Sequence, residues 1–282
     1  MSSVTAPAAL AVWGSPIAHS RSPQLHAAAY EVLGLPWTYD RREVTVEGFP
    51  RALEGLDGRW RGLSLTMPLK ERAFEAVVQR DRRAELTGAV NTLLLTDRGQ
   101  PRGVNTDVGG LVRAMQEEGI DRVETGRLIG AGATAASALV ALGELGARRV
   151  DVLARRPPAA EPLVLLGARL GTEVVVHQLD GHEAVPAEVT IATLPGGTVL
   201  ESDVAARAAD GGGMLLDAAY SPWPSALARS WESTGAPARS GRGMLLHQAV
   251  LQVRFFVAGD VEAVLTDEDS VVAAMRAALM GD

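Results

Sequence analysis

The chain has 282 residues, 47% of them hydrophobic, which suits a folded protein of two domains. Its formal net charge of −7, from 34 acidic and 27 basic residues, provides no general basic surface for nucleic acid or an anionic membrane. It contains no cysteine, which excludes disulfides, thiolate catalysis and cysteine metal sites. The five histidines show no metal-ligand spacing, so we expect no metal. Residues 1–11 lack the pattern of a signal peptide, so we expect a cytoplasmic protein.

The first part of the chain alternates short apolar runs with helical patterns. Expected strands cover residues 10–14, 37–44, 62–65 and 89–95, and expected helices include 23–33 and 46–56. This alternation predicts an α/β fold with parallel strands joined by right-handed helical crossovers. Most of the polar motifs described below fall where a strand ends, which is where α/β sheets bind their ligands.

The middle of the chain predicts a Rossmann-type sheet after a connecting helix at 109–118. Its strands are expected at residues 127–129, 149–154, 174–176, 189–193 and 214–218, with a helix at 135–145. The most apolar window, 128–147, contains several glycines and Glu144, which indicates a buried strand and helix instead of a membrane span.

After residue 243 the pattern is purely helical, at 244–257 and 270–280, and we expect these helices to pack on the first domain. The expected domains are therefore residues 1–107 plus 243–282, and residues 108–242.

A glycine-rich turn follows the expected strand 127–129 and fits the dinucleotide pattern G-x-G-x-x-A. Its residues are Gly130, Ala131, Gly132, Ala133, Thr134 and Ala135. The first glycine permits the tight turn, the second lets backbone N–H groups approach a pyrophosphate, and the small last residue permits close helix–strand packing. The helix N-terminus adds partial positive charge. We interpret the turn as a dinucleotide site; close packing in an alanine-rich chain is the alternative.

The end of the next strand indicates which dinucleotide binds. Ala154, Arg155 and Arg156 stand where an NAD-binding protein places a carboxylate for the ribose hydroxyls. An arginine there can form a bidentate interaction with the 2′-phosphate of NADP. We therefore favour NADP and assign the phosphate to Arg155, whereas we interpret Arg148 and Arg149 as a solvated basic face.

Two short motifs before this turn each end in a residue suited to proton transfer. Lys70 closes Gly-Leu-Ser-Leu-Thr-Met-Pro-Leu-Lys, and Asp107 closes Gly-Val-Asn-Thr-Asp. An acid/base pair beside a nucleotide site indicates redox chemistry, because reduction of a ketone requires a proton as the hydride arrives. Taken alone, Lys70 would be interpreted as a surface lysine at the start of a helix.

Further polar motifs complete an ordered series. Ser20 and Ser22 precede a helix, where their hydroxyls and the helix N–H groups can face an anion, although N-capping alone is a commoner role. The series is Ser-x-Ser-Pro at 20–23, Leu-Thr-Met-Pro-Leu-Lys at 65–70, Gly-Ala-Val-Asn-Thr at 88–92, Asn-Thr-Asp at 105–107, the glycine turn, Asp-Ala-Ala-Tyr-Ser-Pro at 217–222 and Gly-Met-Leu-Leu-His-Gln-Ala at 243–249. In this order the motifs resemble the shikimate dehydrogenase family over essentially the whole chain. The resemblance implies reversible NADP-linked interconversion of shikimate and 3-dehydroshikimate, a step in aromatic amino acid (chorismate) biosynthesis.

The resemblance also implies roles at matching positions. Lys70 would be the catalytic acid/base, paired with Asp107. Substrate contacts would come from Ser20, Ser22, Ser64, Thr66, Asn91, Asp107, Tyr220 and Gln248, with Ser20, Ser22 and Tyr220 at the carboxylate. Cofactor contacts would come from the glycine turn and from Ala154, Arg155, Arg156, Thr193, Ala218, Gly241 and Met244. Residues 1–107 with 243–282 would bind substrate and 108–242 NADP, with the active site in the cleft between the two domains.

Two positions depart from the family pattern. Ser64 replaces the usual asparagine, so we expect one substrate contact to be lost or water-mediated. The usual Asn-Arg-Thr after the second Rossmann strand is Ala154-Arg155-Arg156, which removes a polar group beside adenosine and adds a cation. We expect the preference for NADP to survive this change.

Three alternatives stay open. A dual quinate/shikimate dehydrogenase often uses NAD, although Ser22 and Arg155 favour shikimate and NADP. A catalytically silent NADP-binding sensor would have no need of both Lys70 and Asp107. A folate-type dehydrogenase of similar architecture would leave Ser-x-Ser-Pro and Asn-Thr-Asp unexplained. The sequence is compatible with either a monomer or a homodimer.

Overall fold

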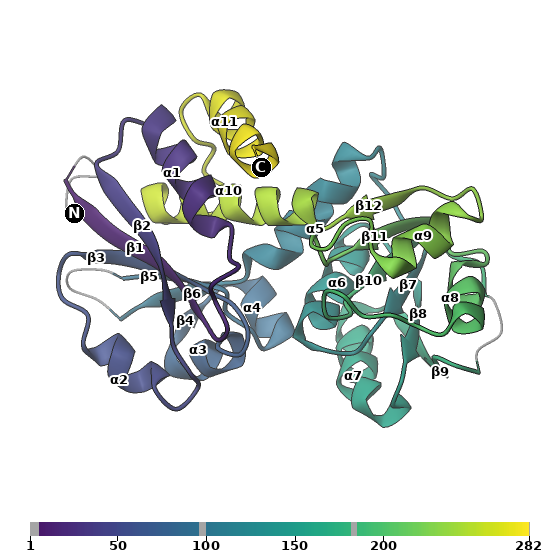
Figure 1. Ribbon diagram of the computed structural model, residues 1–282. Coiled ribbons are helices and arrows are strands. Elements are labelled where there is room, and N and C mark those ends of the chain that lie inside the picture. Colours follow the sequence, from purple (N-terminus) through teal and green to yellow (C-terminus); the bar gives the residue numbers. More distant parts are fainter. Residues whose placement is uncertain (1–5, 96–99, 182–184, 282) are drawn as a thin grey trace. The chain divides into compact units, whose positions relative to one another are not determined.

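The computed structural model describes residues 6–95, 100–181 and 185–281. The chain divides into two compact units, Met1–Gly110 with Leu246–Asp282, and Leu111–Leu245. These boundaries lie three residues beyond the expected ones, at 110 instead of 107 and at 246 instead of 243. In the part of the chain that the structure describes, each unit contains a six-stranded sheet covered by helices (Figure 1). The expected α/β class is confirmed.

The sheet of the first unit has the strand order β2-β1-β3-β5-β6-β4. Its strands are β1 (Ala8–Gly14), β2 (Trp37–Glu43), β3 (Trp60–Leu65), β4 (Gln79–Arg80), β5 (Thr92–Leu94) and β6 (Arg102–Val104). The expectation of parallel strands throughout is wrong here, because β5 is antiparallel to both β3 and β6. Only the seven residues 95–101 separate β5 from β6, too few for the crossover that a parallel pair requires.

Helices cover both faces of this first sheet. They are α1 (Ser22–Val32), α2 (Phe49–Glu54), α3 (Lys70–Ala76), α4 (Arg82–Thr87), the part of α10 (Arg242–Ala258) from Leu246 onward, and α11 (Glu268–Met280). Figure 1 shows α1, α10 and α11 on one face and α2 and α3 on the other. Because α11 packs against α1, the expectation that the terminal helices return to the first domain is confirmed.

A glycine allows α10 to lie close to the sheet. A Cβ atom at Gly62 would stand 2.5 Å from Phe256 Cε1 and 2.7 Å from Leu93 O, closer than a side chain can approach. On the opposite face, the buried Trp13 makes an edge-to-face contact with Phe49 of α2, with ring centroids 6.2 Å apart. Aromatic packing therefore holds one face of the sheet, and the absence of a side chain at Gly62 brings α10 onto the other.

The sheet of the second unit is parallel throughout, with the order β12-β11-β10-β7-β8-β9. Its strands are β7 (Thr125–Ile129), β8 (Arg149–Ala154), β9 (Glu173–Gln178), β10 (Val189–Ala192), β11 (Met214–Asp217) and β12 (Ala238–Ser240). Counted from β7 as the first strand, this is the order 3-2-1-4-5-6 of a Rossmann fold. The predicted Rossmann-type sheet is confirmed.

The helices of the second unit include three that the sequence patterns did not reveal. The expected ones are α5 (Thr106–Glu117), which begins in the first unit, and α6 (Ala133–Glu144); the others are α7 (Glu161–Leu170), α8 (Ser202–Ala209) and α9 (Ala226–Glu232). The apolar window 128–147 forms the end of β7 and the largely buried α6, as expected.

No helix in the described ranges is both long enough and apolar enough to cross a bilayer.

Candidate active site

Lys70 and Asp107 form an ion pair inside the first unit. Lys70 is the first residue of α3, directly after the loop that leaves β3, and Asp107 lies in the first turn of α5. Lys70 Nζ is 2.6 Å from Asp107 Oδ2, and the side chains are 17% and 7% exposed. This geometry is a short charge-assisted hydrogen bond with limited access to solvent.

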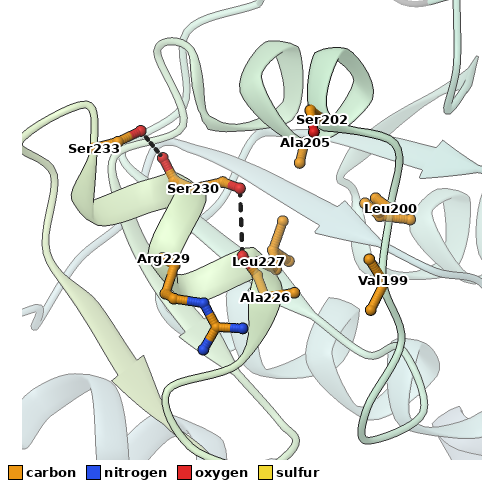
Figure 2. Close-up of a pocket in the computed structure, with 9 residues that line it drawn as sticks. All are labelled: Val199, Leu200, Ser202, Ala205, Ala226, Leu227, Arg229, Ser230 and Ser233. Atoms are coloured by element: carbon orange, nitrogen blue, oxygen red, sulfur yellow. Dashed lines mark hydrogen bonds between the residues drawn. The ribbon is translucent and has the colours of Figure 1, made fainter.

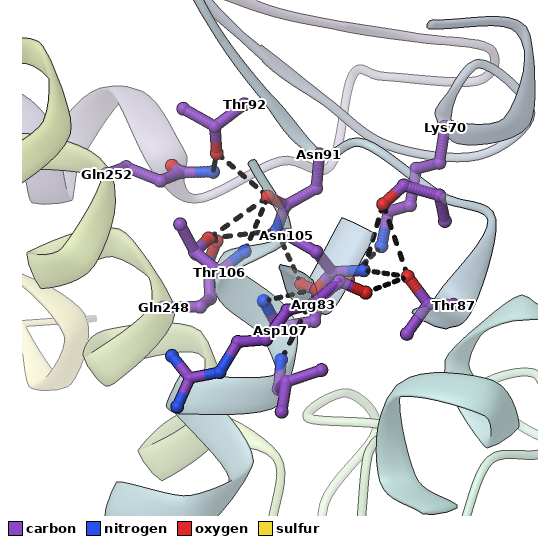
Figure 3. Close-up of polar contacts among 12 residues, drawn as sticks. Lys70, Arg83, Thr87, Asn91, Thr92, Asn105, Thr106, Asp107, Gln248 and Gln252 are labelled. Atoms are coloured by element: carbon purple, nitrogen blue, oxygen red, sulfur yellow. Dashed lines mark hydrogen bonds and ion pairs between the residues drawn. The ribbon is translucent and has the colours of Figure 1, made fainter. Parts of the chain in front are cut away.

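Asn91 connects this pair to the polar residues around it (Figure 3). Its amide nitrogen donates to Asp107 Oδ1 at 2.8 Å and to Thr106 Oγ1 at 2.9 Å, and its Oδ1 accepts from the Thr106 backbone N–H at 2.9 Å. Both oxygens of the Asp107 carboxylate are therefore engaged, one by Lys70 and one by Asn91. The carboxylate cannot rotate without breaking two hydrogen bonds, so its orientation is fixed.

Asn105, which sequence reasoning did not assign to the site, holds the start of α5. Its Oδ1 accepts from the backbone N–H groups of Asp107, at 3.0 Å, and Val108, at 3.4 Å. Its amide nitrogen donates to Thr87 Oγ1 at 2.9 Å and to Ala89 O at 3.1 Å. This is helix N-capping by a buried side chain. The expected helix began at residue 109, and α5 begins at Thr106, so the capping position was not recognised.

Ser64 belongs to a second branch of the same network. Ser64 Oγ donates to Gln252 Oε1 at 2.8 Å, and Gln252 Nε2 donates to Thr92 Oγ1 at 3.1 Å. Thr92 Oγ1 in turn donates to Asn91 Oδ1 at 2.8 Å. A continuous chain of hydrogen bonds therefore runs from Ser64 of β3 to the amide that holds Asp107.

Gln252 was missed by sequence reasoning, whereas Gln248, one helical turn earlier on α10, was predicted. Thr106 Oγ1 donates to Gln248 Oε1 at 3.5 Å, so both glutamines face the same buried cluster. Residues four apart lie on the same face of a helix, and this spacing was the available signal for Gln252.

Ser20 and Ser22 lie together at the start of α1. Ser20 Oγ donates to Ser22 Oγ at 3.3 Å and accepts from the Ser22 backbone N–H at 3.3 Å. Helix α1 has Arg21 at its N-cap position and no side-chain capping bond, so neither serine hydroxyl serves as an ordinary N-cap. The two hydroxyls and the first turn of α1 form a compact group of polar atoms suited to a carboxylate.

The other predicted substrate residues lie at two places. Thr66 is half-buried in the loop between β3 and Lys70, and its backbone N–H donates to Trp13 O at 2.9 Å. Tyr220 belongs to the second unit, after β11, and is also half-buried. The structure therefore brings Lys70, Asp107, Asn91, Ser64 and Gln248 into one network, pairs Ser20 with Ser22, and places Tyr220 in the other unit.

The glycine turn of the second unit joins β7 to α6 as the sequence predicts. Gly130 has a φ of 111°, and a Cβ atom there would lie 2.6 Å from Thr193 Oγ1. Gly132 is the N-cap residue of α6, which has no side-chain capping bond, and the space beside its Cα is open. Ala135 is fully buried. An uncapped helix N-terminus beside an open glycine suits a pyrophosphate, so these residues fit a dinucleotide.

Arg155 and Arg156 follow the end of β8 and are both exposed, after the buried Ala154. Neither guanidinium forms an ion pair within the described residues. The Arg155 backbone is held by Gln178 of β9, whose Nε2 donates to Arg155 O at 3.0 Å. Two cations on a fixed backbone, with open solvent around them, suit a phosphate monoester.

The remaining predicted cofactor residues cluster where β10, β11 and β12 end. Thr193 follows β10 and donates its backbone N–H to Ile129 O at 2.8 Å, next to the glycine turn. Ala218 follows β11, and Gly241 follows β12 and donates its backbone N–H to Ala219 O at 3.3 Å. A Cβ atom at Gly241 would collide with Ala218 O. Met244 is buried in the first turn of α10.

One side chain, that of Asp217, fixes the segment that follows β11. Asp217, the last residue of β11, accepts from Ser225 Oγ at 2.7 Å and from the Ala219 backbone N–H at 3.1 Å. Burial raises the pKa of Asp217, and these two hydrogen bonds oppose the increase. The segment that begins with Ala218 is therefore fixed to the sheet.

A separate pocket of about 380 Å³ lies between α8 and α9 (Figure 2). Two of its hydroxyls are used by the α9 backbone, because Ser230 donates to Ala226 O and Ser233 donates to Ser230 O. Arg229 donates to Pro224 O at 2.7 Å. None of the residues predicted to bind cofactor or substrate lines it.

Comparison with known proteins identifies the family. Residues 12–93 match the model of the shikimate dehydrogenase substrate binding domain. A shikimate dehydrogenase (NADP(+)) from Natronomonas pharaonis is 38% identical over 84% of this chain and 88% of its own length. The crystal structure of Mycobacterium tuberculosis shikimate dehydrogenase is 39% identical, with a TM-score of 0.82 and coverage of 96% of this chain and 100% of that one.

A second solved structure carries both ligands. It is shikimate 5-dehydrogenase from Thermus thermophilus in complex with NADP(H) and shikimate, which is 30% identical, with a TM-score of 0.79 and coverage of 96% of this chain and 99% of that one. The fold, the order of motifs and these similarities agree along nearly the full length. The chain belongs to the shikimate dehydrogenase family.

Proposed function

We propose that the protein is an NADP-dependent shikimate dehydrogenase that interconverts 3-dehydroshikimate and shikimate in aromatic amino acid (chorismate) biosynthesis. Family membership supports the reaction, and the observation that supports the mechanism is the ion pair of Lys70 and Asp107 within a fully hydrogen-bonded network. NADPH supplies the hydride that reduces the substrate ketone.

Lys70 acts as the acid in this reduction. As the ketone carbon accepts the hydride, its oxygen gains negative charge, and the Lys70 ammonium donates a proton to it. Oxidation of shikimate runs in reverse, with neutral Lys70 removing the hydroxyl proton. Asp107 holds the Lys70 side chain in place at 2.6 Å, and Asn91 prevents the carboxylate from rotating.

The other predicted ligands position the substrate. Ser20 and Ser22, with Tyr220, bind the carboxylate, and Thr66, Asn91, Asp107 and Gln248 bind ring hydroxyls. A small polyhydroxylated acid needs many directional donors and acceptors, and a site of this kind rejects analogues that leave its buried polar groups unpaired.

The second unit binds NADP in this proposal. The N-terminus of α6 with Gly130–Ala135 holds the pyrophosphate, and Arg155 with Arg156 binds the 2′-phosphate. Ala218 and Gly241 lie near the nicotinamide, and Thr193 and Met244 are further cofactor contacts. Residues 1–107 with 243–282 form the substrate domain and 108–242 the NADP domain. The protein acts in the cytoplasm, as a monomer or a homodimer.

The test is a matrix of initial rates with shikimate and quinate, each with NADP and with NAD. We expect the highest kcat/KM for shikimate with NADP. Activity only with quinate and NAD would contradict the proposal and favour a quinate dehydrogenase. Binding of NADP without turnover of either substrate would favour a sensor.

A further inference from the structure

Tyr39 of β2 lies next to the start of α1, in a ring cluster that it forms with His26 and Tyr30 of that helix. Its ring stacks on His26 of α1, with centroids 3.9 Å apart and planes 15° apart. His26 Nδ1 is 2.9 Å from the Ser22 backbone oxygen, so the imidazole connects the tyrosine ring to the first turn of α1. Stacking and this hydrogen bond fix Tyr39 relative to Ser22.

The sheet register directs Tyr39 towards Ser64 as well. Tyr39 pairs with Leu10 of β1, and Leu10 pairs with Gly62 of β3. Because side chains alternate along a strand, Ser64 faces the same side of the sheet as Gly62 and Tyr39. Tyr39 and Ser64 therefore lie on the same face of the sheet, with β1 between their strands.

The hydroxyl of Tyr39 is buried and makes no hydrogen bond within the described residues. Burial raises its pKa, and the nearby hydroxyls of Ser64 and Ser22 oppose that increase, which identifies the two serines as its polar neighbours. Neither serine meets it with the geometry of a hydrogen bond. An unpaired buried hydroxyl is costly, and a partner acquired during substrate binding removes that cost.

Substrate binding changes the hydrogen bonds of Ser22, whereas those of Ser64 stay as they are. Ser64 donates its proton to Gln252 Oε1 at 2.8 Å and does not accept from Tyr39. Ser22 Oγ accepts from Ser20 Oγ at 3.3 Å; in the proposed function both hydroxyls donate to the substrate carboxylate, which leaves Ser22 Oγ to accept from Tyr39. A hydroxyl that accepts a hydrogen bond is a stronger donor to an anion, because the two bonds polarise each other.

We propose that Tyr39 is a positioning residue of the carboxylate site, which donates to Ser22 Oγ when Ser22 donates to the substrate carboxylate. This inference rests on the proposed function. It extends the site to a residue of β2 that none of the sequence motifs contains.

The test is Tyr39→Phe in the full-length protein, with steady-state kinetics and thermal unfolding. We expect the KM for shikimate to rise roughly tenfold, with kcat and the KM for NADP unchanged. Without shikimate the Tm should stay the same or rise, because the change removes an unpaired buried hydroxyl. The increase in Tm that shikimate produces should become smaller.

The matched control is Tyr30→Phe. Tyr30 lies in the same ring cluster, with its centroid 6.5 Å from that of Tyr39, and its hydroxyl is also buried without a hydrogen bond in the described residues. The charged and polar groups that act on its hydroxyl are Tyr39 and Arg61. We expect the KM of Tyr30→Phe for shikimate to remain that of the unmodified protein.

A double-mutant cycle separates positioning from a general structural role. In a Ser22→Ala background, Tyr39→Phe should change the KM for shikimate by no more than about twofold, because the acceptor is already absent. Two results would overturn this proposal and leave the proposed function intact. One is a KM for shikimate in Tyr39→Phe equal to that of the unmodified protein. The other is an increase in KM from Tyr39→Phe that is as large in the Ser22→Ala background as in the unmodified protein. Absence of shikimate turnover in the unmodified protein would overturn both.

Discussion

Asn105 connects the stability of α5 to the position of Asp107. Its side chain accepts hydrogen bonds from two backbone N–H groups at the start of the helix, one of which belongs to Asp107 itself. A side chain that binds the backbone at the start of α5 can therefore control the orientation of the acid/base pair.

We predict that Asn105→Ala lowers the free energy of unfolding by about 1 kcal/mol, the usual cost of a lost N-cap, and also lowers kcat. The reduction in kcat arises because the first turn of α5, which carries Asp107, loses its anchor. Chemical denaturation and initial rates measure the two effects.

The control is Thr45→Ala. Thr45 accepts from the Gly48 backbone N–H at 3.3 Å in an exposed turn before α2. This variant should lose some stability at unchanged kcat. An Asn105→Ala variant with unaltered turnover would show that the cap serves stability alone.

His26 is a second residue whose environment has a measurable consequence. Burial lowers the pKa of His26 from 6.5 to about 4. Between these two values the unfolded chain binds a proton that the folded protein does not, so stability falls as the pH decreases through this window.

We predict that this histidine contributes roughly 2 kcal/mol to the loss of unfolding free energy between pH 7 and pH 5. In His26→Phe, which retains a ring against Tyr39, that contribution should disappear. Urea unfolding of both proteins at the two pH values provides the comparison; parallel pH dependences would mean that His26 is accessible to protons in the folded state.

At the residue scale, the sequence predicted side chains that stand in motifs and missed those that support them. Lys70, Asp107 and Asn91 were recognised because each belongs to an ordered motif. Gln252 acts through hydrogen bonds that exist only after β3, β5 and α10 have come together, and Asn105 donates to Thr87 and Ala89, which lie 16 to 18 residues earlier in the chain. Tyr39 was overlooked for the same reason, since its neighbours Ser22 and Ser64 come from other elements.

At the scale of elements, the second unit contains a buried cation that ties β7 to distant loops. Arg127 is 1% exposed and donates to Ala208 O at 2.5 Å, to Asp210 O at 3.3 Å and to Val185 O. Burial lowers the pKa of its guanidinium. Three backbone carbonyls that no strand or helix satisfies therefore depend on one side chain.

We predict that Arg127→Leu lowers the unfolding free energy by about 3 kcal/mol, because these carbonyls become buried without a donor. The matched control is the exposed Arg148, whose ion-pair partner Glu124 is 3.9 Å away, and Arg148→Leu should change stability by less than about 0.5 kcal/mol. Denaturation curves that place the two variants within experimental error of each other would contradict this account of Arg127.

Elements with clear periodicity were predicted well, and short ones were not. Strands β1, β2 and β8 and helices α1 and α6 lie within a few residues of their expected positions. The two-residue strand β4 is too short to carry a periodic pattern, and the antiparallel direction of β5 follows from a short connection instead of from its apolar residues.

At the scale of the whole molecule, the sequence places two groups of predicted site residues in different units. The first unit contains the network around Lys70 and the paired serines, and the second contains the uncapped glycine turn and the exposed arginines. In the proposed function, reduction of NADP by shikimate uses residues of both units. Most of the motifs follow the end of a strand, which is where α/β sheets bind their ligands.

The most direct test of the central claim is the initial rate of NADPH formation from shikimate and NADP, measured for the unmodified protein and for Lys70→Ala, with NADPH affinity measured in parallel. We predict turnover by the unmodified protein and a reduction of roughly 100-fold or more in Lys70→Ala at nearly unchanged NADPH affinity, as expected when a general acid is removed. Near-normal turnover in Lys70→Ala, or no turnover by the unmodified protein, would contradict the account.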